Sequence, residues 1–110
     1  MPKKAELEAL INPTNCNVAW TDNYNGTGIK GRICTGKTEP YTSNSVFLPA
    51  AGYCGSVGVY GQGNDGNYWS STPERSNFAY GLYFEWGGQS VSDGNRSIGY
   101  SVRAVLAEFD

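Results

Sequence analysis

The stretch Phe78-Ala79-Tyr80-Gly81-Leu82-Tyr83-Phe84-Glu85 decides the fold class of this chain. Large apolar side chains recur at alternate positions, and mostly smaller or more polar residues lie between them. A period of two residues is typical of a β-strand that packs one face on the core. The stretch therefore predicts a strand over residues 78–85, with Leu82 on the buried face and with Tyr83 and Glu85 on the solvent face.

The residues that follow predict an antiparallel partner for that strand. Gly87-Gly88 marks a turn, and residues 89–93 return beside the first strand. Asp93-Gly94-Asn95 predicts a second turn. Residues 100–106 then predict a closing strand, and the side chains that share one of its faces are Val102, Ala104 and Leu106. Residues 68–71, upstream, predict a further strand.

The N-terminal region predicts the only long helix. Residues 2–12 place Leu7, Leu10 and Ile11 on one helical face, and Pro2 suits a first helical position. Asn12-Pro13 ends the helix, because proline disfavours the helical conformation in the residue before it.

Short strands and loops fill the interval between that helix and residue 68. Residues 18–21 and 28–35 predict a hairpin, residues 46–53 a buried strand, and residues 54–67 a long glycine-rich loop. One helix and six or seven strands in 110 residues predict a single domain, residues 1–110. Its class is α+β, with one or two helices, small antiparallel sheets and long loops.

The composition excludes several classes of partner. Charged residues make up 16% of the chain and the net charge is -2, with no block of Lys and Arg, so no nucleic-acid partner is expected. No apolar run approaches the roughly 18 residues of a membrane span, so no membrane insertion is expected. Abundant Tyr, Ser, Gly and Asn are typical of antibody-type binding surfaces and of loop-rich extracellular β domains alike. We expect an extracellular location or the surface of a cell or phage, with any export signal outside this chain.

The cysteine and histidine counts bear on catalysis and on metals. The chain has three cysteines, Cys16, Cys34 and Cys54, so either one bridge and a free thiol or three reduced thiols are possible. It has no histidine and no Cys-x-x-Cys pair. A Ser-His or Cys-His catalytic pair is therefore excluded, and a zinc site lacks ligands. We expect no catalytic residues, no metal, no cofactor and no enzymatic activity.

Three stretches of the sequence carry a family resemblance. They are PKKAELEAL (residues 2–10), FLPAAGY followed by GNYWSST (residues 47–53 and 66–72), and NRSIGYSVRAV (residues 95–105). In this order they resemble the Fibrobacter succinogenes major paralogous domain, which is common in secreted proteins of gut Bacteroidetes and their phages. The resemblance covers nearly the whole chain, and the first stretch is also similar to a helix of formylglycine-generating-enzyme-like domains.

The resemblance implies a C-type-lectin-like fold whose loop-rich lobe carries binding. It extends to the variable proteins of diversity-generating retroelements, which display a mutable surface near the C-terminus. Formylglycine-generating enzymes use a late pair of cysteines, which this chain lacks because its last cysteine is Cys54. Calcium-dependent sugar binding needs a set of carboxylates and amides, and the nearest approach, Asn64-Asp65-Gly66-Asn67, is read as a turn.

The predicted binding surface centres on the turn after residue 85. Trp86 lies between Glu85 and two glycines at a predicted hairpin tip, where burial is difficult, and an exposed tryptophan is a common binding anchor. Trp20 and Trp69 are instead predicted in the core, and Arg96 and Arg103 in structural roles. The full predicted ligand-binding set is Tyr83, Glu85, Trp86, Gln89, Ser90, Ser92, Asp93, Asn95, Glu74, Arg75 and Asn77.

These observations predict a ligand-binding module for an extracellular protein or glycan. Recognition is expected to use aromatic anchors and neutral hydrogen bonds, with a weak dependence on salt. The alternative is a structural or assembly domain of a surface adhesin, pilus-like or phage tail protein that has no separate ligand.

Overall fold

The computed structural model describes residues 1–105, except for the side chain of Arg75. The α-helix is α1 (Lys4–Ile11), and a 3-10 turn, η1 (Tyr24–Gly26), follows the first strand. The strands are β1 (Cys16–Thr21), β2 (Gly31–Gly36), β3 (Ser45–Pro49), β4 (Tyr53–Gly55), β5 (Gly58–Tyr60), β6 (Gly66–Arg75), β7 (Phe78–Glu85) and β8 (Gly88–Asn95). The predicted α+β class with small antiparallel sheets is confirmed.

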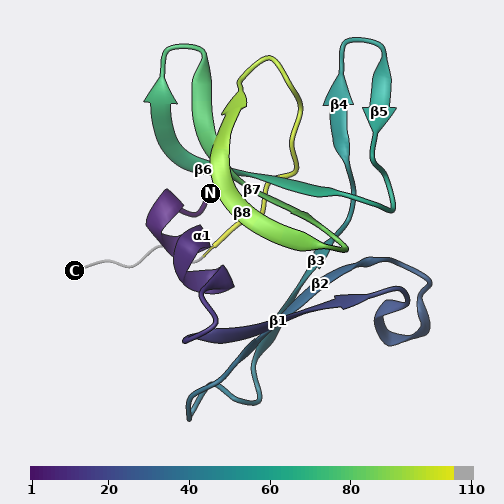
Figure 1. The fold of residues 1–110 in the computed structure, drawn as a ribbon, viewed down its shortest axis with the longest axis vertical. Helices are drawn as coiled ribbons and strands as arrows, with labels where there is room; N and C mark the ends of the chain where they lie inside the picture. The colour runs from purple at the N-terminus through teal and green to yellow at the C-terminus, as the bar shows by residue number, and fades with distance from the viewer. Residues whose placement is uncertain (106–110) are drawn as a thin grey trace.

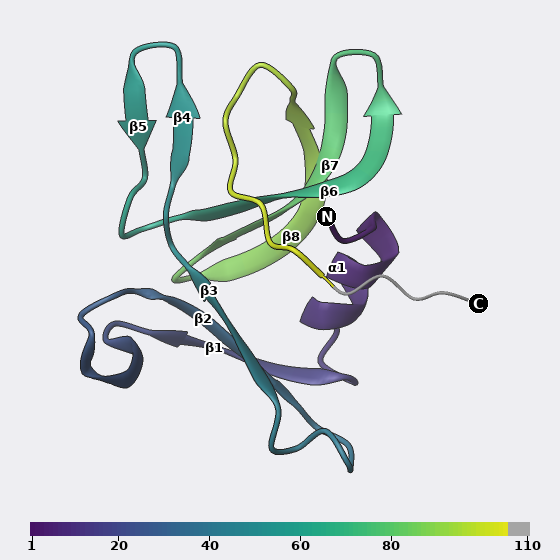
Figure 2. The same cartoon turned by 180° about the vertical axis from the view of Figure 1, so that it is seen from behind.

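The strands form three antiparallel sheets, β1-β2-β3, β4-β5 and β6-β7-β8. Figure 1 shows the two larger sheets one above the other, with α1 beside them and the β4-β5 hairpin standing apart. The helix contacts β1 of one sheet and all three strands of the other. The helix therefore bridges the two larger sheets, and Figure 2 shows the same arrangement from behind.

The core forms where these elements meet. Leu82 and Phe84, on the predicted buried face of β7, are each only 1% exposed, and Leu7 of α1 and Leu48 of β3 are also buried. Each such side chain contributes roughly 1.5–3 kcal/mol by leaving water. Gly66 is required beside Phe84, because a Cβ at residue 66 would lie 2.0 Å from the ring atom Cζ. The alternation read from the sequence is confirmed in the last part of β7, where Leu82 and Phe84 are buried, Tyr83 is half-buried and Glu85 is exposed.

The predicted closing strand over residues 100–106 is wrong for the described part. Residues 102–105 have no regular structure, Val102 is exposed, and Leu106 lies outside the described residues. In Figure 1 the chain after β8 passes between β4 and the β6-β8 sheet. It makes isolated bridges to both, Gly99 with Cys54 of β4 and Ser101 with Tyr68 of β6. The chain meets the two sheets at one residue each while it crosses from one to the other, so no ladder forms.

Two other loop predictions also need correction. Within residues 54–67 the chain forms the β4-β5 hairpin, whose paired rings Tyr53 and Tyr60 stack with centroids 5.5 Å apart. The turn predicted at residues 93–95 lies at residues 96–98, because Gly94 and Asn95 still pair in β8. Gly94 pairs with Ala79, and its lack of a side chain makes room for Tyr100, whose hydroxyl lies 2.7 Å from where a Cβ would be.

The three cysteines are free thiols, which is one of the two possibilities left open by their number. Cys34 is buried, Cys16 is half-buried and Cys54 is exposed. Burial and the nearby Cys16 together raise the pKa of the Cys34 thiol to about 11, although Arg32 lowers it in part.

Candidate functional site

The β7-β8 hairpin presents Trp86 to solvent. β7 ends at Glu85, β8 begins at Gly88, and the two residues between them form the turn. The Trp86 side chain is 76% exposed, as predicted from its position at the tip. An indole in this position offers a large amphipathic surface that the fold itself does not use.

A buried arginine from the other sheet fixes the backbone of this turn. Arg32 in β2 is 9% exposed, and its Nη2 donates to the carbonyl oxygens of Glu85 at 2.7 Å and Trp86 at 3.0 Å. A longer contact of 3.5 Å reaches the carbonyl of Gly88. Burial lowers the pKa of Arg32. The planar guanidinium serves several carbonyls at once, so it ties the tip of one sheet to the middle of the other.

The same arginine lies against a second tryptophan. The Arg32 Cζ atom is 5.9 Å from the ring centroid of Trp20, its neighbour in β1, and the Trp20 indole N–H donates to Asp22 Oδ1 at 2.9 Å. Trp20 packs against the core but remains half-buried. Its predicted core position is therefore only partly right, because one part of its indole faces the cleft described next.

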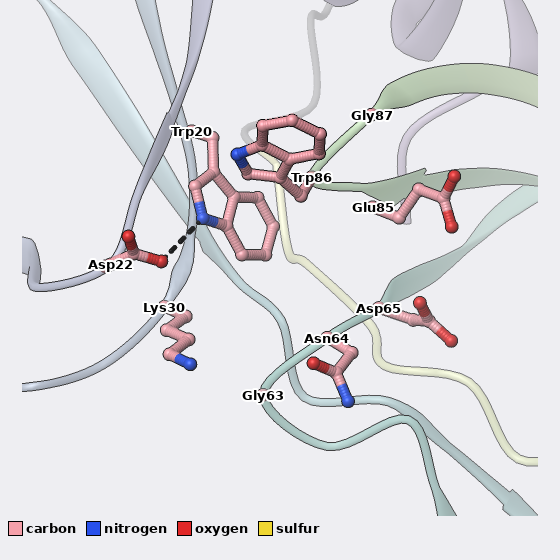
Figure 3. Close-up of a pocket in the computed structure, with 9 residues that line it drawn as sticks. All are labelled: Trp20, Asp22, Lys30, Gly63, Asn64, Asp65, Glu85, Trp86 and Gly87. Atoms are coloured by element: carbon pink, nitrogen blue, oxygen red, sulfur yellow. Dashed lines mark hydrogen bonds between the residues drawn. The ribbon is translucent and has the colours of Figure 1, made fainter.

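Trp20 and Trp86 line one open cleft of about 480 Å³ (Figure 3). Four separate segments contribute to it, and its lining residues are Trp20, Asp22, Lys30, Gly63, Asn64, Asp65, Glu85, Trp86 and Gly87. A volume of this size is typical of small-molecule sites, which combine aromatic walls with a few polar groups. We call this feature the two-tryptophan cleft.

The charged groups of the two-tryptophan cleft are mostly acidic. Asp22, Asp65 and Glu85 line it together with a single cation, Lys30. Figure 3 shows Asp65 and Glu85 on the same side, away from Trp20. Burial raises the pKa of Asp65, and the negative charge of Glu85 raises it further. This acidic lining differs from the neutral binding surface that the composition predicts.

Tyr83 borders this acidic side. Its hydroxyl donates to Glu85 Oε2 at 3.1 Å. Burial raises the pKa of Tyr83, and the hydrogen bond to Glu85 and the charge of Asp65 add to the shift. The phenol therefore stays protonated and remains a donor to Glu85 at neutral pH.

The other predicted residues of the hairpin divide between its two faces. Gln89 pairs with Phe84 and Asp93 pairs with Tyr80. Paired residues share a face, so the side chains of Gln89 and Asp93 leave the backbone on the core-facing side of the sheet. The Gln89 Oε1 atom is buried and has no hydrogen-bond partner. Tyr83, by contrast, pairs with Ser90 on the opposite face, which Ser92 shares. The predicted cluster of Tyr83, Glu85, Trp86 and Gln89 is thus split by the sheet.

A second group of predicted residues lies at the far end of β7. Glu74 lies near the end of β6, Asn77 lies in the β6-β7 turn, and Asn95 pairs with Phe78, the first residue of β7. Eight strand residues span about 23 Å from end to end. These three side chains are therefore remote from Trp86, and the Arg75 side chain lies outside the described part of the chain. Of the predicted set, only Glu85 and Trp86 line the two-tryptophan cleft, with Tyr83 beside them.

Sequence reasoning missed most of the cleft. The missed residues are Trp20, Asp22, Lys30, Gly63, Asn64, Asp65 and Gly87. The signal available in the sequence was the polar turn at residues 64–65, which reads equally well as an ordinary bend. Trp20 gave no separate signal, because a tryptophan in a short apolar run is usually a core residue.

Arg96 has the structural role predicted for it, whereas the core position predicted for Trp69 is only partly right, because that side chain is half-buried. Arg96 donates from Nε to the carbonyl of Phe78 at 3.1 Å and so ties the end of β8 to β7. Trp69 stacks on Tyr100 with ring centroids 4.1 Å apart. Arg103 is exposed.

Residues 1–105 contain neither a candidate metal site nor a helix that could span a membrane. No group of three or more His, Cys, Asp or Glu side chains in this range could hold a metal ion. Within the same residues, no helix has both the length and the apolar character needed to cross a membrane.

Comparison with known proteins identifies one family. No curated protein and no solved structure matches the chain. Residues 20–105, which include every lining residue of the two-tryptophan cleft, match the family described as "Domain of unknown function (DUF8237)". The match covers more than half of the 110 residues, and the chain therefore belongs to the DUF8237 family.

Proposed function

We propose that this domain is a non-enzymatic binding module that takes its ligand in the two-tryptophan cleft. The observation that carries the proposal is Trp86, whose indole is 76% exposed while Arg32 fixes its backbone. Tryptophan is enriched among the residues that dominate binding energy. The fold gains little from leaving this indole in water, so a role in binding accounts for its position.

The fixed backbone supports the proposal energetically. Ordering a flexible loop on binding costs free energy, and a turn that is already held by hydrogen bonds avoids much of that cost. Arg32 bonds two consecutive carbonyls of this turn, so Trp86 is presented from a stiff support. Trp20, Asn64 and Lys30 add an aromatic wall and hydrogen-bonding groups around it.

The ligand that we propose is a protein or glycan outside the cell or at the surface of a cell or phage. Indole faces stack on sugar rings and on apolar side chains, and the amide of Asn64 can bond to hydroxyls or peptide groups. The resemblance to the Fibrobacter succinogenes paralogous domain supports the same proposal. So does the C-type-lectin-like fold that the resemblance implies, with its relation to the variable proteins of diversity-generating retroelements.

Labelling of intact cells tests the function. Fluorescent wild-type protein is incubated with a panel of gut bacterial cells, beside Trp86→Ala and a control, Tyr41→Ala, which removes an exposed aromatic outside the cleft. We expect Trp86→Ala to lose labelling while its Tm stays within about 4 °C of wild type. Tyr41→Ala is expected to label as wild type does. Equal labelling by wild type and Trp86→Ala on every strain would refute the proposal.

Two treatments of the labelled strain identify the ligand class. Periodate, which oxidises sugar diols, is expected to abolish labelling if the ligand is a glycan. Protease treatment of the cells is expected to abolish it if the ligand is a protein.

A second candidate function is a structural or assembly domain, and the β4-β5 hairpin favours it. This hairpin exposes Val57, which is 84% exposed, together with Val59 and Tyr60, and it contains no charged residue. Exposed apolar strands without charges are prone to pair with other chains. If the domain self-assembles, its molar mass by light scattering rises with concentration, and Val59→Lys is expected to prevent the rise.

A further inference from the structure

We propose that the ligand group taken by the two-tryptophan cleft is an organic ammonium whose apolar carbons stack on Trp86. This inference rests on the proposed function and adds the chemical class of the ligand. Three features of the cleft support it: its charge, its aromatic walls and its width.

The charge of the cleft is unbalanced. Three carboxylates, from Asp22 after β1, Asp65 before β6 and Glu85 at the end of β7, line it against the one ammonium of Lys30. Asp65 and Glu85 lie on the same side of the cleft (Figure 3), and the negative charge of Glu85 adds to the effect of burial in raising the pKa of Asp65. A ligand with a positive charge relieves this repulsion, whereas a neutral or anionic ligand does not.

The walls of the cleft suit the same ligand. The π-faces of tryptophan attract cations, and quaternary ammonium groups are bound in aromatic cages for this reason. The fold already uses this interaction at Trp20, where Arg32 lies 5.9 Å from the ring centroid, and at Tyr80, where Lys4 Nζ lies at 4.1 Å. Trp86 is an exposed indole that lines the same cleft as the carboxylates.

The width of the cleft favours an organic cation over a metal ion. No group of His, Cys, Asp and Glu among residues 1–105 lies close enough to hold a metal. The carboxylates are instead distributed around an open volume of about 480 Å³, which accommodates a substituted ammonium together with part of the molecule that carries it.

Titration of the whole chain with small probes tests the inference. Choline chloride is titrated while tryptophan fluorescence is recorded, with sodium chloride at the same ionic strength as the blank. The matched neutral probe is 3,3-dimethylbutan-1-ol, in which carbon replaces the quaternary nitrogen. We expect saturable quenching by choline, no saturable quenching by the alcohol, and weaker choline binding as the ionic strength rises.

Variants assign the effect to the cleft. Asp65→Asn combined with Glu85→Gln is expected to weaken choline binding about tenfold, because two of the three carboxylates that line the cleft are lost. Trp86→Ala is expected to abolish the signal. Glu8→Gln removes a carboxylate from an exposed position of α1 and is expected to bind as wild type does.

Two further probes distinguish the source of the ammonium. Glucosamine, compared with N-acetylglucosamine, represents an amino sugar, and a peptide with trimethyllysine, compared with the same peptide acetylated at that lysine, represents a protein. The tightest of the three cations identifies the source.

Equal binding of choline and its neutral isostere, or unchanged affinity in the double variant, overturns the inference, as does the absence of saturable binding by all three cations. Those results leave the proposed function standing if the cell labelling still depends on Trp86.

Discussion

The Nη2 atom of Arg32 lies 3.0 Å from the carbonyl oxygen of Trp86, which is 54 residues further along the chain. Through this bond the middle of the β1-β2-β3 sheet holds the tip of the β7-β8 hairpin, as the arrangement in Figure 1 allows. The bond also places a cation behind the turn while the Trp86 indole points into solvent. One buried side chain thereby links the packing of the domain to the geometry of its cleft.

Replacing this arginine is expected to destabilise the domain and to loosen the hairpin tip. Arg32→Lys keeps the charge but loses the planar donor group that reaches the carbonyls of Glu85 and Trp86. Because the position is buried, we expect a loss of about 2 kcal/mol in the free energy of unfolding, measured with urea. Arg96→Lys, at an exposed position, is the control and is expected to change stability by less than about 1 kcal/mol. Equal effects of the two substitutions would show that burial of Arg32 does not matter.

Two glycines of the β6-β7-β8 sheet are expected to respond very differently to alanine. At Gly66 a Cβ would lie 2.0 Å from Cζ of the buried Phe84 ring, so Gly66→Ala forces that ring to move. We expect it to cost about 1–3 kcal/mol, as overpacking of a core generally does. Gly88→Ala meets nothing within 4 Å and is expected to stay within about 0.5 kcal/mol of wild type. Thermal unfolding of both variants decides the point, and a stable Gly66→Ala protein would contradict the packing described here.

The buried Tyr68 predicts a loss of stability in alkali. Its hydroxyl donates to the carbonyl of Pro49 at 2.8 Å, and burial raises its pKa to about 12, although Arg103 lowers it in part. The folded state therefore binds the phenolic proton more tightly than the unfolded chain, whose tyrosines ionise near pH 10. The stabilisation is complete below about pH 10 and decreases as the pH rises toward 12, by about 3 kcal/mol in all.

The comparison with Tyr68→Phe isolates this contribution. The variant is expected to be about 1 kcal/mol less stable at pH 7, because it lacks the hydrogen bond to Pro49. Its stability is then expected to decrease less than that of wild type between pH 10 and pH 12. Tyr41→Phe, at an exposed position, serves as the control with an unchanged pH profile. Parallel profiles for wild type and Tyr68→Phe would exclude the effect.

The three thiols are expected to react in a fixed order. Cys54 is exposed, whereas Cys34 is buried and has a pKa of about 11, so almost none of it is thiolate at neutral pH. With a disulfide reagent under native conditions, we expect Cys54 to react first and Cys34 only after unfolding in denaturant. Cys54→Ser is expected to remove the fastest phase. A fast phase that persists in Cys54→Ser would place the reactive thiol elsewhere.

The sequence by itself determined the local elements with the strongest patterns. The period of two in residues 78–85 gave the strand β7, the apolar spacing of Leu7, Leu10 and Ile11 gave the helix α1, and the glycines after Trp86 indicated an exposed tip. Each of these elements depends on residues that are close together in the chain, so each can be predicted from the sequence alone. The short β4-β5 hairpin was missed because its glycines resemble those of a loop. The closing strand failed because the chain only touches the edge of β6 at Ser101, and residues 102–105 then continue without pairing.

Only the tertiary structure decided where the candidate site lies. The cleft combines residues 20–22, residue 30, residues 63–65 and residues 85–87, which belong to different sheets and loops. Arg32, whose hydrogen bonds hold Trp86 beside Trp20, lies in a strand that carries no local sign of that role. Distant segments meet according to how whole sheets pack and which buried polar groups need partners, and no periodicity along the chain records that outcome.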